Sequence, residues 1–277
     1  MSDTNTDVHI TVLSGASRGL GLAMARQLLL PGQHLLCLAR RPAGELSPMA
    51  QAQGCVLEQW AVDLAEPTMA AERLHDWLLR QRAQLHAAGK TVASVTLINN
   101  AAWLPPALPL SLVAHADVQQ ALRVGLEAPM LLTASLLHAT RSWSNDGPHD
   151  GASPLSTAPV VRKVLNISSG LGRRPMASQA TYCALKAGLD HYTRCLALEE
   201  ALQPHGAKVC SLAPGVVDTD MQVQLRSSAT STFPDQPRFA QLHTQGQLTT
   251  PDEAARQVLA YLARTDFGDQ PVADVRG

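Results

Sequence analysis

The sequence predicts an α/β fold in which a parallel sheet of about seven strands is covered by helices on both faces. Short apolar runs alternate with longer stretches of helical periodicity along almost the whole chain, which is the pattern of consecutive βαβ units. The apolar runs are nearly continuous rather than alternating with polar residues, as expected for strands buried on both faces. Right-handed crossovers between such strands give a doubly wound sheet.

Each element follows from local residue types. Strands are expected where β-branched and apolar residues form short runs bounded by turn residues, at 8–13, 34–39, 55–62, 92–98, 161–168, 208–212 and 271–275. Helices are expected where apolar residues recur with helical spacing, at 20–30, 67–86, 116–140, 179–203 and 251–263.

Two segments lack periodicity. Residues 141–160 are rich in Ser, Asn, Asp and Gly, and are expected to form a surface-loop insertion. Residues 219–248 are polar and irregular, and are expected to form a lid over a substrate. No break in composition divides the chain, so residues 1–277 are expected to be one domain, with 1–7 as a frayed tail.

Composition excludes several classes of function. The formal net charge is −1 and charged residues make up 16% of the chain, so a nucleic-acid partner is not expected. The polar N-terminus does not resemble a signal peptide, and no apolar run reaches the length of a membrane helix, so a soluble cytoplasmic protein is expected. The five cysteines and ten histidines show no metal-ligand spacing, and we expect no metal site.

A glycine-rich loop follows the first expected strand. Gly15, Gly19 and Gly21 stand between that strand and the first helix. Gly15 would form the tight turn, Gly19 would let the backbone approach a pyrophosphate, and Gly21 would let the helix and strand pack closely. The N-terminus of the helix would offer free N–H groups to the phosphates. The loop therefore predicts a Rossmann-type dinucleotide-binding domain, with a plain glycine turn as the alternative.

The end of the second strand indicates which dinucleotide binds. NAD sites usually place a carboxylate there to accept hydrogen bonds from the ribose hydroxyls. Here the residues are Arg40 and Arg41, and Arg18 lies in the glycine loop. Guanidinium groups are suited to bidentate phosphate contacts, so we predict that the cofactor is NADP(H). The alternative is that these arginines only form a solvated strand end.

A second constellation carries residues suited to catalysis. Ser168 and Ser169 end the fifth strand, and Tyr182 and Lys186 follow on the next helix, four residues apart and hence on one helical face. A tyrosine has an ordinary pKa of about 10. A nearby ammonium is expected to lower that pKa and prepare the phenol for proton transfer. A hydroxyl such as Ser169 can polarise a carbonyl. Taken alone, a Tyr–Lys pair of this spacing is more often a surface pair.

Four features occur in an order that resembles the short-chain dehydrogenase/reductase family. They are the glycine loop, Asn99-Asn100-Ala101-Ala102 after the fourth strand, the Ser–Tyr–Lys set, and Pro214-Gly215. The resemblance covers residues 8–275. It implies that Tyr182 is the general acid in reduction, that Lys186 lowers its pKa and holds the nicotinamide ribose, and that Ser169, 13 residues before Tyr182, orients the carbonyl.

The resemblance also implies the cofactor contacts. They fall on Gly15, Ser17, Arg18, Gly19, Leu20, Gly21, Arg40, Arg41, Asp63, Leu64, Asn99, Ala101, Tyr182, Lys186, Pro214, Gly215, Val217 and Thr219. Among these, Asp63 would accept from the adenine amino group, with an ordinary helix cap as the alternative.

Within the family, the run at 214–222 resembles sepiapterin reductases, and the stretches around Ser169 and Lys186 also resemble bacterial benzil reductases. The resemblance implies an NADPH-dependent carbonyl reductase acting on a 1,2-dicarbonyl, an aromatic ketone or a pterin side chain. Asp274 falls on the acid that anchors the pterin in sepiapterin reductases, although it could equally be a solvated strand residue. Trp103 and Met176 are expected to line the substrate pocket, with a place in the core as the alternative.

One departure from the family pattern concerns Gly125, which stands where the family usually has an asparagine that kinks the helix and supports a proton relay. Glycine there could still permit the kink and leave room for a water. The alternative function is therefore a non-catalytic NADP(H)-binding redox sensor or scaffold of the same fold. The family usually pairs subunits through the helices at 116–140 and 179–203, so a homo-oligomer, a dimer or tetramer, is expected.

Overall fold

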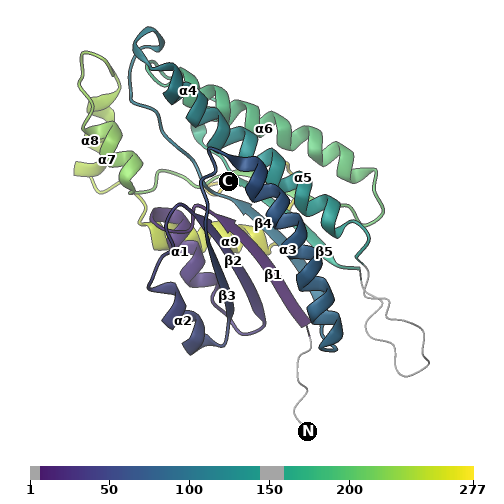
Figure 1. Cartoon of the computed structure of the whole chain (residues 1–277). Helices are drawn as coiled ribbons and strands as arrows, with labels where there is room; N and C mark the ends of the chain where they lie inside the picture. The colour runs from purple at the N-terminus through teal and green to yellow at the C-terminus, as the bar shows by residue number, and fades with distance from the viewer. Residues whose placement is uncertain (1–6, 144–158) are drawn as a thin grey trace.

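The computed structural model describes residues 7–143 and 159–277. Within them, all strands lie in one parallel sheet with the order β3-β2-β1-β4-β5-β6-β7 (Figure 1). The strands are β1 (Asp7–Ser14), β2 (Gln33–Ala39), β3 (Val56–Ala61), β4 (Thr91–Asn99), β5 (Val161–Ile167), β6 (Lys208–Ala213) and β7 (Val272–Asp274). The predicted doubly wound sheet and its seven strands are confirmed.

The helices cover both faces of the sheet, as predicted. They are α1 (Gly19–Leu28), α2 (Leu46–Gln53), α3 (Pro67–Ala87), α4 (His115–Leu122), α5 (Ala128–Thr140), α6 (Ala180–Ala201), α7 (Asp220–Arg226), α8 (Gln236–Thr244) and α9 (Pro251–Ala263). One core cluster joins the sheet to α3, α5 and α6, and the other joins its opposite face to α1 and α9. In Figure 1, α7 and α8 project away from the sheet, beyond the main layers.

Three predictions about elements need correction. The segment 219–248 is not irregular, because it contains α7 and α8, and α2 was not predicted. Residue Asp7 belongs to β1 rather than to a frayed tail, while residues 1–6 lie outside the described part of the chain. Most of the predicted loop at 141–160 also lies outside it, and the buried Trp143 and Val160 border the gap.

The predicted helix at 116–140 is interrupted at Gly125. Residues Arg123–Glu127 form a π-helical turn (η2) between α4 and α5. A Cβ at position 125 would lie 2.8 Å from Leu185 Cδ1 on α6, closer than real Cβ atoms approach. The expected distortion of the helix is therefore present, and the side chain of Leu185 fills the space that a side chain at position 125 would need. The expected room for a water stays a prediction.

The sheet order places a crevice where the connections diverge. The chain leaves β1 towards β2 on one side, and later returns to β4 on the other side of β1. Ligands of doubly wound folds bind outside the carboxyl ends of the strands at such a switch point. None of the described helices combines the length and apolar character that crossing a bilayer requires.

Candidate active site

A crevice lies at the carboxyl ends of the strands, between the glycine loop and the segment that carries α7 and α8. All the predicted cofactor residues line it except Arg41 and Asn99. Of the predicted substrate residues, Ser169, Trp103 and Met176 line it and Asp274 does not. The structure therefore brings most of the predicted site residues together in one crevice, and the exceptions have identifiable physical causes.

The glycine loop leaves no room for side chains. Gly15 has a φ of +72°, and a Cβ there would lie 2.8 Å from Ala101 Cα. A Cβ on Gly21 would lie 2.0 Å from Gly15 O, so helix α1 can approach the strand end only if position 21 is glycine. Gly19 also has a positive φ, of +54°, and faces Thr219 across the crevice. We call the backbone of these three glycines the cradle, and Cβ atoms added to them would fill it.

The N-terminus of α1 points its polar backbone groups at this cradle. Arg18 is the N-cap residue, its side chain makes no capping hydrogen bond, and the first turn contains no acidic residue. The first N–H groups of a helix without such a cap are free to bind an anion, and the helix dipole favours negative charge there. The loop and helix thus fit the pyrophosphate of a dinucleotide.

The charged residues at the adenosine end differ in their partners. Arg40 lines the crevice, whereas Arg41 does not, so only one of the two guanidiniums at the end of β2 is placed for a phosphate. Arg18, predicted as a third phosphate ligand, instead forms an exposed ion pair of 2.8 Å with Asp220 of α7. Asp63 lines the crevice and accepts a hydrogen bond from Ala65 N at 2.9 Å, but it does not cap a helix, because α3 begins at Pro67 with Glu66 as its N-cap residue.

Asn99, a predicted cofactor residue, does not line the crevice, whereas its neighbour Asn100 does. The side chain of Asn99 is 2% exposed and donates to Asn166 Oδ1 at 2.9 Å, inside the sheet. Asn100 lines the crevice and its Nδ2 donates to the backbone oxygens of Ser14 and Gly15. Successive side chains of a strand point to opposite faces, so an error of one residue at the strand end exchanges a buried for a crevice-facing side chain.

Ser169, Tyr182 and Lys186 converge on the floor of the crevice. Ser169 stands just after β5, its Oγ accepts a hydrogen bond from Leu171 N at 3.2 Å, and its hydroxyl is near enough to Tyr182 to lower the pKa of that phenol. Lys186, one turn beyond Tyr182 on α6, is 3% exposed and donates from Nζ to Ile167 O at 2.7 Å. Its Nζ lies 5.7 Å from the centroid of the Tyr182 ring.

Burial sets the protonation of this pair. It raises the pKa of Tyr182 to about 12, because the charged phenolate is disfavoured, and the nearby hydroxyl of Ser169 opposes this only in part. Our expectation that Lys186 lowers the Tyr182 pKa is therefore not met in the chain itself. Burial lowers the pKa of Lys186 to about 8, against the opposing charge of Asp190. At neutral pH the phenol thus carries its proton.

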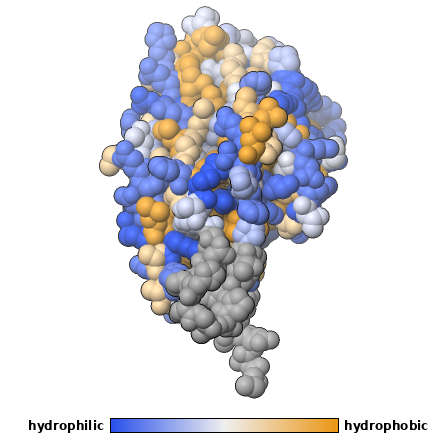
Figure 2. All heavy atoms as spheres, turned by 90° about the vertical axis from the view of Figure 1, so that its right-hand side faces the viewer, coloured by the Kyte–Doolittle hydropathy of each residue, from blue (hydrophilic) through white to orange (hydrophobic). Residues whose placement is uncertain are grey.

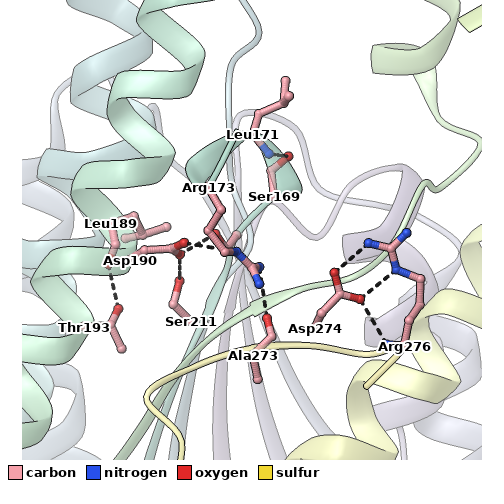
Figure 3. Close-up of polar contacts among 11 residues, drawn as sticks. Ser169, Leu171, Arg173, Leu189, Asp190, Thr193, Ser211, Ala273, Asp274 and Arg276 are labelled. Carbon is pink, nitrogen blue, oxygen red and sulfur yellow. Dashed lines mark hydrogen bonds and ion pairs between the residues drawn. The ribbon is translucent and has the colours of Figure 1, made fainter. Parts of the chain in front are cut away.

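Sequence reasoning did not single out Asp190 as a functional residue. It lies one turn after Lys186 and is 1% exposed, and its Oδ1 accepts from Ser168 Oγ at 2.5 Å and Ser211 Oγ at 2.7 Å. Figure 3 shows Arg173 reaching towards the same carboxylate, with Nε 3.6 Å from Oδ2. A buried charge held in this way fixes α6 against the ends of β5 and β6. The sequence signal for Asp190 was its spacing of four residues from Lys186, which places both side chains on one face of α6.

Asp274, expected near the substrate, is paired with an arginine and does not line the crevice. At the end of β7 it forms a bidentate ion pair with Arg276, at 2.7 and 2.8 Å, and Figure 3 shows the two side chains facing each other. Arg276 also keeps the pKa of Asp274 below its ordinary value. Both carboxylate oxygens are thus occupied, and it is Arg276 that lines the crevice.

The lid packs through a small apolar cluster of its own. Leu104, Leu225, Phe233 and Phe239 are buried together, and Met176 and Tyr182 pack against them. The side chain of Phe239 also lines the crevice. This wall, together with Trp103, gives the substrate end of the crevice an apolar surface, which the sequence had indicated only through Trp103 and Met176.

The geometry agrees with the relatives of this chain. Residues 152–230 match the family described as short chain dehydrogenase. The benzil reductase ((S)-benzoin forming) of Bacillus cereus is 30% identical over 94% of this chain and 96% of its own length. The sepiapterin reductase of Rattus norvegicus is 31% identical over 93% of this chain and 92% of its own.

Solved structures extend the likeness to three dimensions. A putative NAD(P)-dependent gluconate 5-dehydrogenase from Beutenbergia cavernae, determined with bound NADP at low occupancy, is 25% identical with a TM-score of 0.72, covering 96% of this chain and 94% of its own. With the glycine cradle, the Ser–Tyr–Lys set and full-length relatives in agreement, this chain belongs to the short-chain dehydrogenase/reductase family of oxidoreductases.

Proposed function

We propose that the protein is an NADPH-dependent carbonyl reductase in which Tyr182 is the general acid. The observation that carries the proposal is the pairing of the Ser169 and Tyr182 hydroxyls on the floor of the crevice, one helical turn from the ammonium of Lys186. Two hydroxyls at one point can both hydrogen-bond a carbonyl oxygen, which polarises the carbonyl and prepares it to receive a proton.

The proton-transfer roles follow from the protonation states. The chemistry that a reduced nicotinamide supplies when bound is a hydride for the carbonyl carbon. Tyr182, whose pKa is raised to about 12, holds the proton that the carbonyl oxygen takes up as its π bond to carbon breaks. The resulting tyrosinate is stabilised by the ammonium of Lys186 and by the hydroxyl of Ser169. Lys186 would also hold the nicotinamide ribose.

The preference for NADPH rests on charge. Arg40 lines the adenosine end of the crevice, and residues 38–41 at the end of β2 include no acidic side chain to accept hydrogen bonds from ribose hydroxyls. A guanidinium there favours a 2′-phosphate through charge-assisted hydrogen bonds. The NADP in the structure from Beutenbergia cavernae supports the same choice.

The substrate is proposed to be a 1,2-dicarbonyl, an aromatic ketone or a pterin side chain. The names of the relatives from Bacillus cereus and Rattus norvegicus support this class, as does the apolar wall formed by Trp103, Met176 and Phe239. The segment 219–248, with α7 and α8, would act as the lid that selects among such ketones.

We further propose a homo-oligomer that pairs through α4, α5 and α6. Three large apolar side chains on these helices are solvent-exposed, namely Leu122, Met130 and Leu198, and Leu202, just after α6, is exposed as well. Figure 2, which views the molecule from the right-hand side of Figure 1, shows hydrophobic patches among hydrophilic residues on the side that it views. Exposed apolar groups of this kind often mark contacts between subunits.

The test of the reductase proposal follows the absorbance of NADPH in the presence of benzil and 1-phenyl-1,2-propanedione. Wild-type protein is expected to consume NADPH, and Tyr182→Phe is expected to lose activity by about 10²- to 10⁴-fold, the usual contribution of a general acid. Calorimetric titration should show that the variant still binds NADPH. NADPH binding without turnover in the wild type, unchanged in Tyr182→Phe, would instead favour a non-catalytic sensor.

A further inference from the structure

Arg174 brings a guanidinium to the edge of the carbonyl site. It lies on the loop that follows η3 (Gly170–Gly172), and its backbone N donates to Gly170 O at 3.1 Å. Its Nη2 is 3.4 Å from the position that a Cβ on Gly170 would take. Because Gly170 follows Ser169 directly, the cation lies beside the residue that would orient the substrate carbonyl.

Arg238 also lines the crevice. It stands in the first turn of α8, next to the crevice-lining Phe239. The two segments are joined, since Ser178 Oγ, on the loop that carries Arg174, donates to Thr232 O of the lid segment at 2.5 Å. Arg174 and Arg238 are therefore held on connected segments that face one crevice.

Neither guanidinium has an anionic partner among residues 7–143 and 159–277. The other arginines near the lid do have one: Arg18 pairs with Asp220, Arg226 with Asp218 and Arg276 with Asp274. The acidic residues that line the crevice in the described chain are Asp63, at the adenosine end, and Asp220, which is paired. The substrate end thus carries an uncompensated positive charge.

We infer that the substrate is a ketone bearing a carboxylate close to its carbonyl group, bound by Arg174 and Arg238. This inference rests on the proposed reductase function and narrows its substrate class to the 2-oxo acids with an aromatic or aliphatic body. The body would contact the apolar wall of Trp103, Met176 and Phe239, while the planar carboxylate matches the fork of a guanidinium. Arg40, at the adenosine end, is left for the cofactor phosphate.

A matched pair of substrates tests the inference. Benzoylformate and its methyl ester share the ketone and the ring, and differ in the charge. Wild-type protein is expected to reduce the acid with a higher kcat/KM than the ester. Arg174→Gln and Arg238→Gln should each lower kcat/KM for the acid by about 10-fold or more, as expected for losing a charged hydrogen bond, and change that for the ester by less than about threefold.

Arg80→Gln is the matched control, because Arg80 is an exposed arginine of α3 that does not line the crevice. It should leave both substrates unaffected. Equal losses for acid and ester in Arg174→Gln and Arg238→Gln would overturn the inference, and so would a wild-type preference for the ester. Reduction of the diketones without any reduction of benzoylformate would also overturn it, while leaving the reductase proposal intact.

A binding measurement keeps the two proposals separable if turnover is absent. Mandelate, the anionic product of benzoylformate reduction, is titrated against Tyr182→Phe saturated with NADP⁺, with methyl mandelate as the neutral comparison. Tighter binding of mandelate that is lost in Tyr182→Phe/Arg174→Gln supports the anion site whatever the catalytic outcome. Binding that does not depend on Arg174 and Arg238 contradicts it.

Discussion

The two halves of the crevice are built in different ways. The cofactor half is made of backbone: Gly15, Gly19 and Gly21 form a cradle in which an added Cβ would collide with main-chain atoms or crowd Thr219. The substrate half is made of side chains from two short helices, which pack through the cluster around Phe233 and Phe239. A backbone cradle suits a ligand that does not change, whereas a wall of side chains can be altered residue by residue without disturbing the sheet.

The largest effect is expected for Gly21→Ala in the cofactor half. The new Cβ would lie 2.0 Å from Gly15 O, so α1 must move away from the strand. We expect a loss of about 3 kcal/mol in the free energy of unfolding, the upper range for overpacking, and no measurable NADPH binding. Urea denaturation and calorimetry measure the two effects. Gly44→Ala is the control, because nothing lies within 4 Å of a Cβ there; equal effects in both variants would contradict the cradle.

Arg40→Ala should have the next largest effect, on cofactor affinity, and only the cofactor that carries the 2′-phosphate should be affected. We expect the Kd for NADPH to rise by about 10- to 100-fold, as for the loss of a charged hydrogen bond, and the Kd for NADH to change little. Arg41→Ala serves as the comparison, since Arg41 does not line the crevice and should have a smaller effect. Parallel losses for NADPH and NADH would argue against a 2′-phosphate at Arg40.

In the substrate half, Phe239→Ala should weaken the binding of the ketone without changing the binding of the cofactor. The substitution opens the lid cluster, and KM for a diketone is expected to rise by about fivefold to 10-fold, while the Kd for NADPH stays unchanged. Gln241→Ala, an exposed residue of the same helix that does not line the crevice, should alter neither constant. A weakened NADPH complex in Phe239→Ala would show that the two halves are not independent.

The smallest change in kcat/KM at neutral pH is expected for Asp190→Asn, which lies at the boundary between the two halves. The Asp190 carboxylate raises the pKa of Lys186 against burial, which lowers it to about 8. Wild-type kcat/KM for reduction should fall as pH rises through about 8, where the ammonium is lost. Without the carboxylate charge the Lys186 pKa falls further, so this limb of the pH profile moves to lower pH.

Ser211→Ala is the control for Asp190→Asn. It removes a hydrogen bond of 2.7 Å to the same carboxylate but leaves its charge in place. Its pH profile should therefore match that of the wild type. If both variants shift the limb equally, the effect is one of packing rather than of charge on Lys186.

The sequence predicted the cofactor half better than the substrate half, for physical reasons. A positive φ or a close approach requires glycine whatever the distant context, so Gly15 and Gly21 can be interpreted locally. The short helices α7 and α8 depend on tertiary contacts through residues such as Phe233, and short polar helices have little stability of their own. They were therefore predicted as irregular chain.

Side-chain partners are also hard to predict from the sequence. Asp220, which pairs with Arg18, is distant in the chain. The sequence also does not fix where the pleat of β4 ends, and this decides that Asn100 rather than Asn99 lines the crevice. The unpaired state of Arg174 and Arg238 is also a property of the folded chain, since it requires knowing which acidic side chains reach them.

The π-helical turn at Gly125 has a consequence for how this enzyme can vary among species. Leu185 Cδ1 occupies the volume that a side chain at position 125 would need, so the side chains at the two positions compete for the same space. A homologue that has asparagine at position 125 needs the Leu185 side chain either to turn aside or to be replaced by a smaller one. Substitutions at these two sites are thus expected to occur together more often than independently, although they lie on different helices and are distant in the chain.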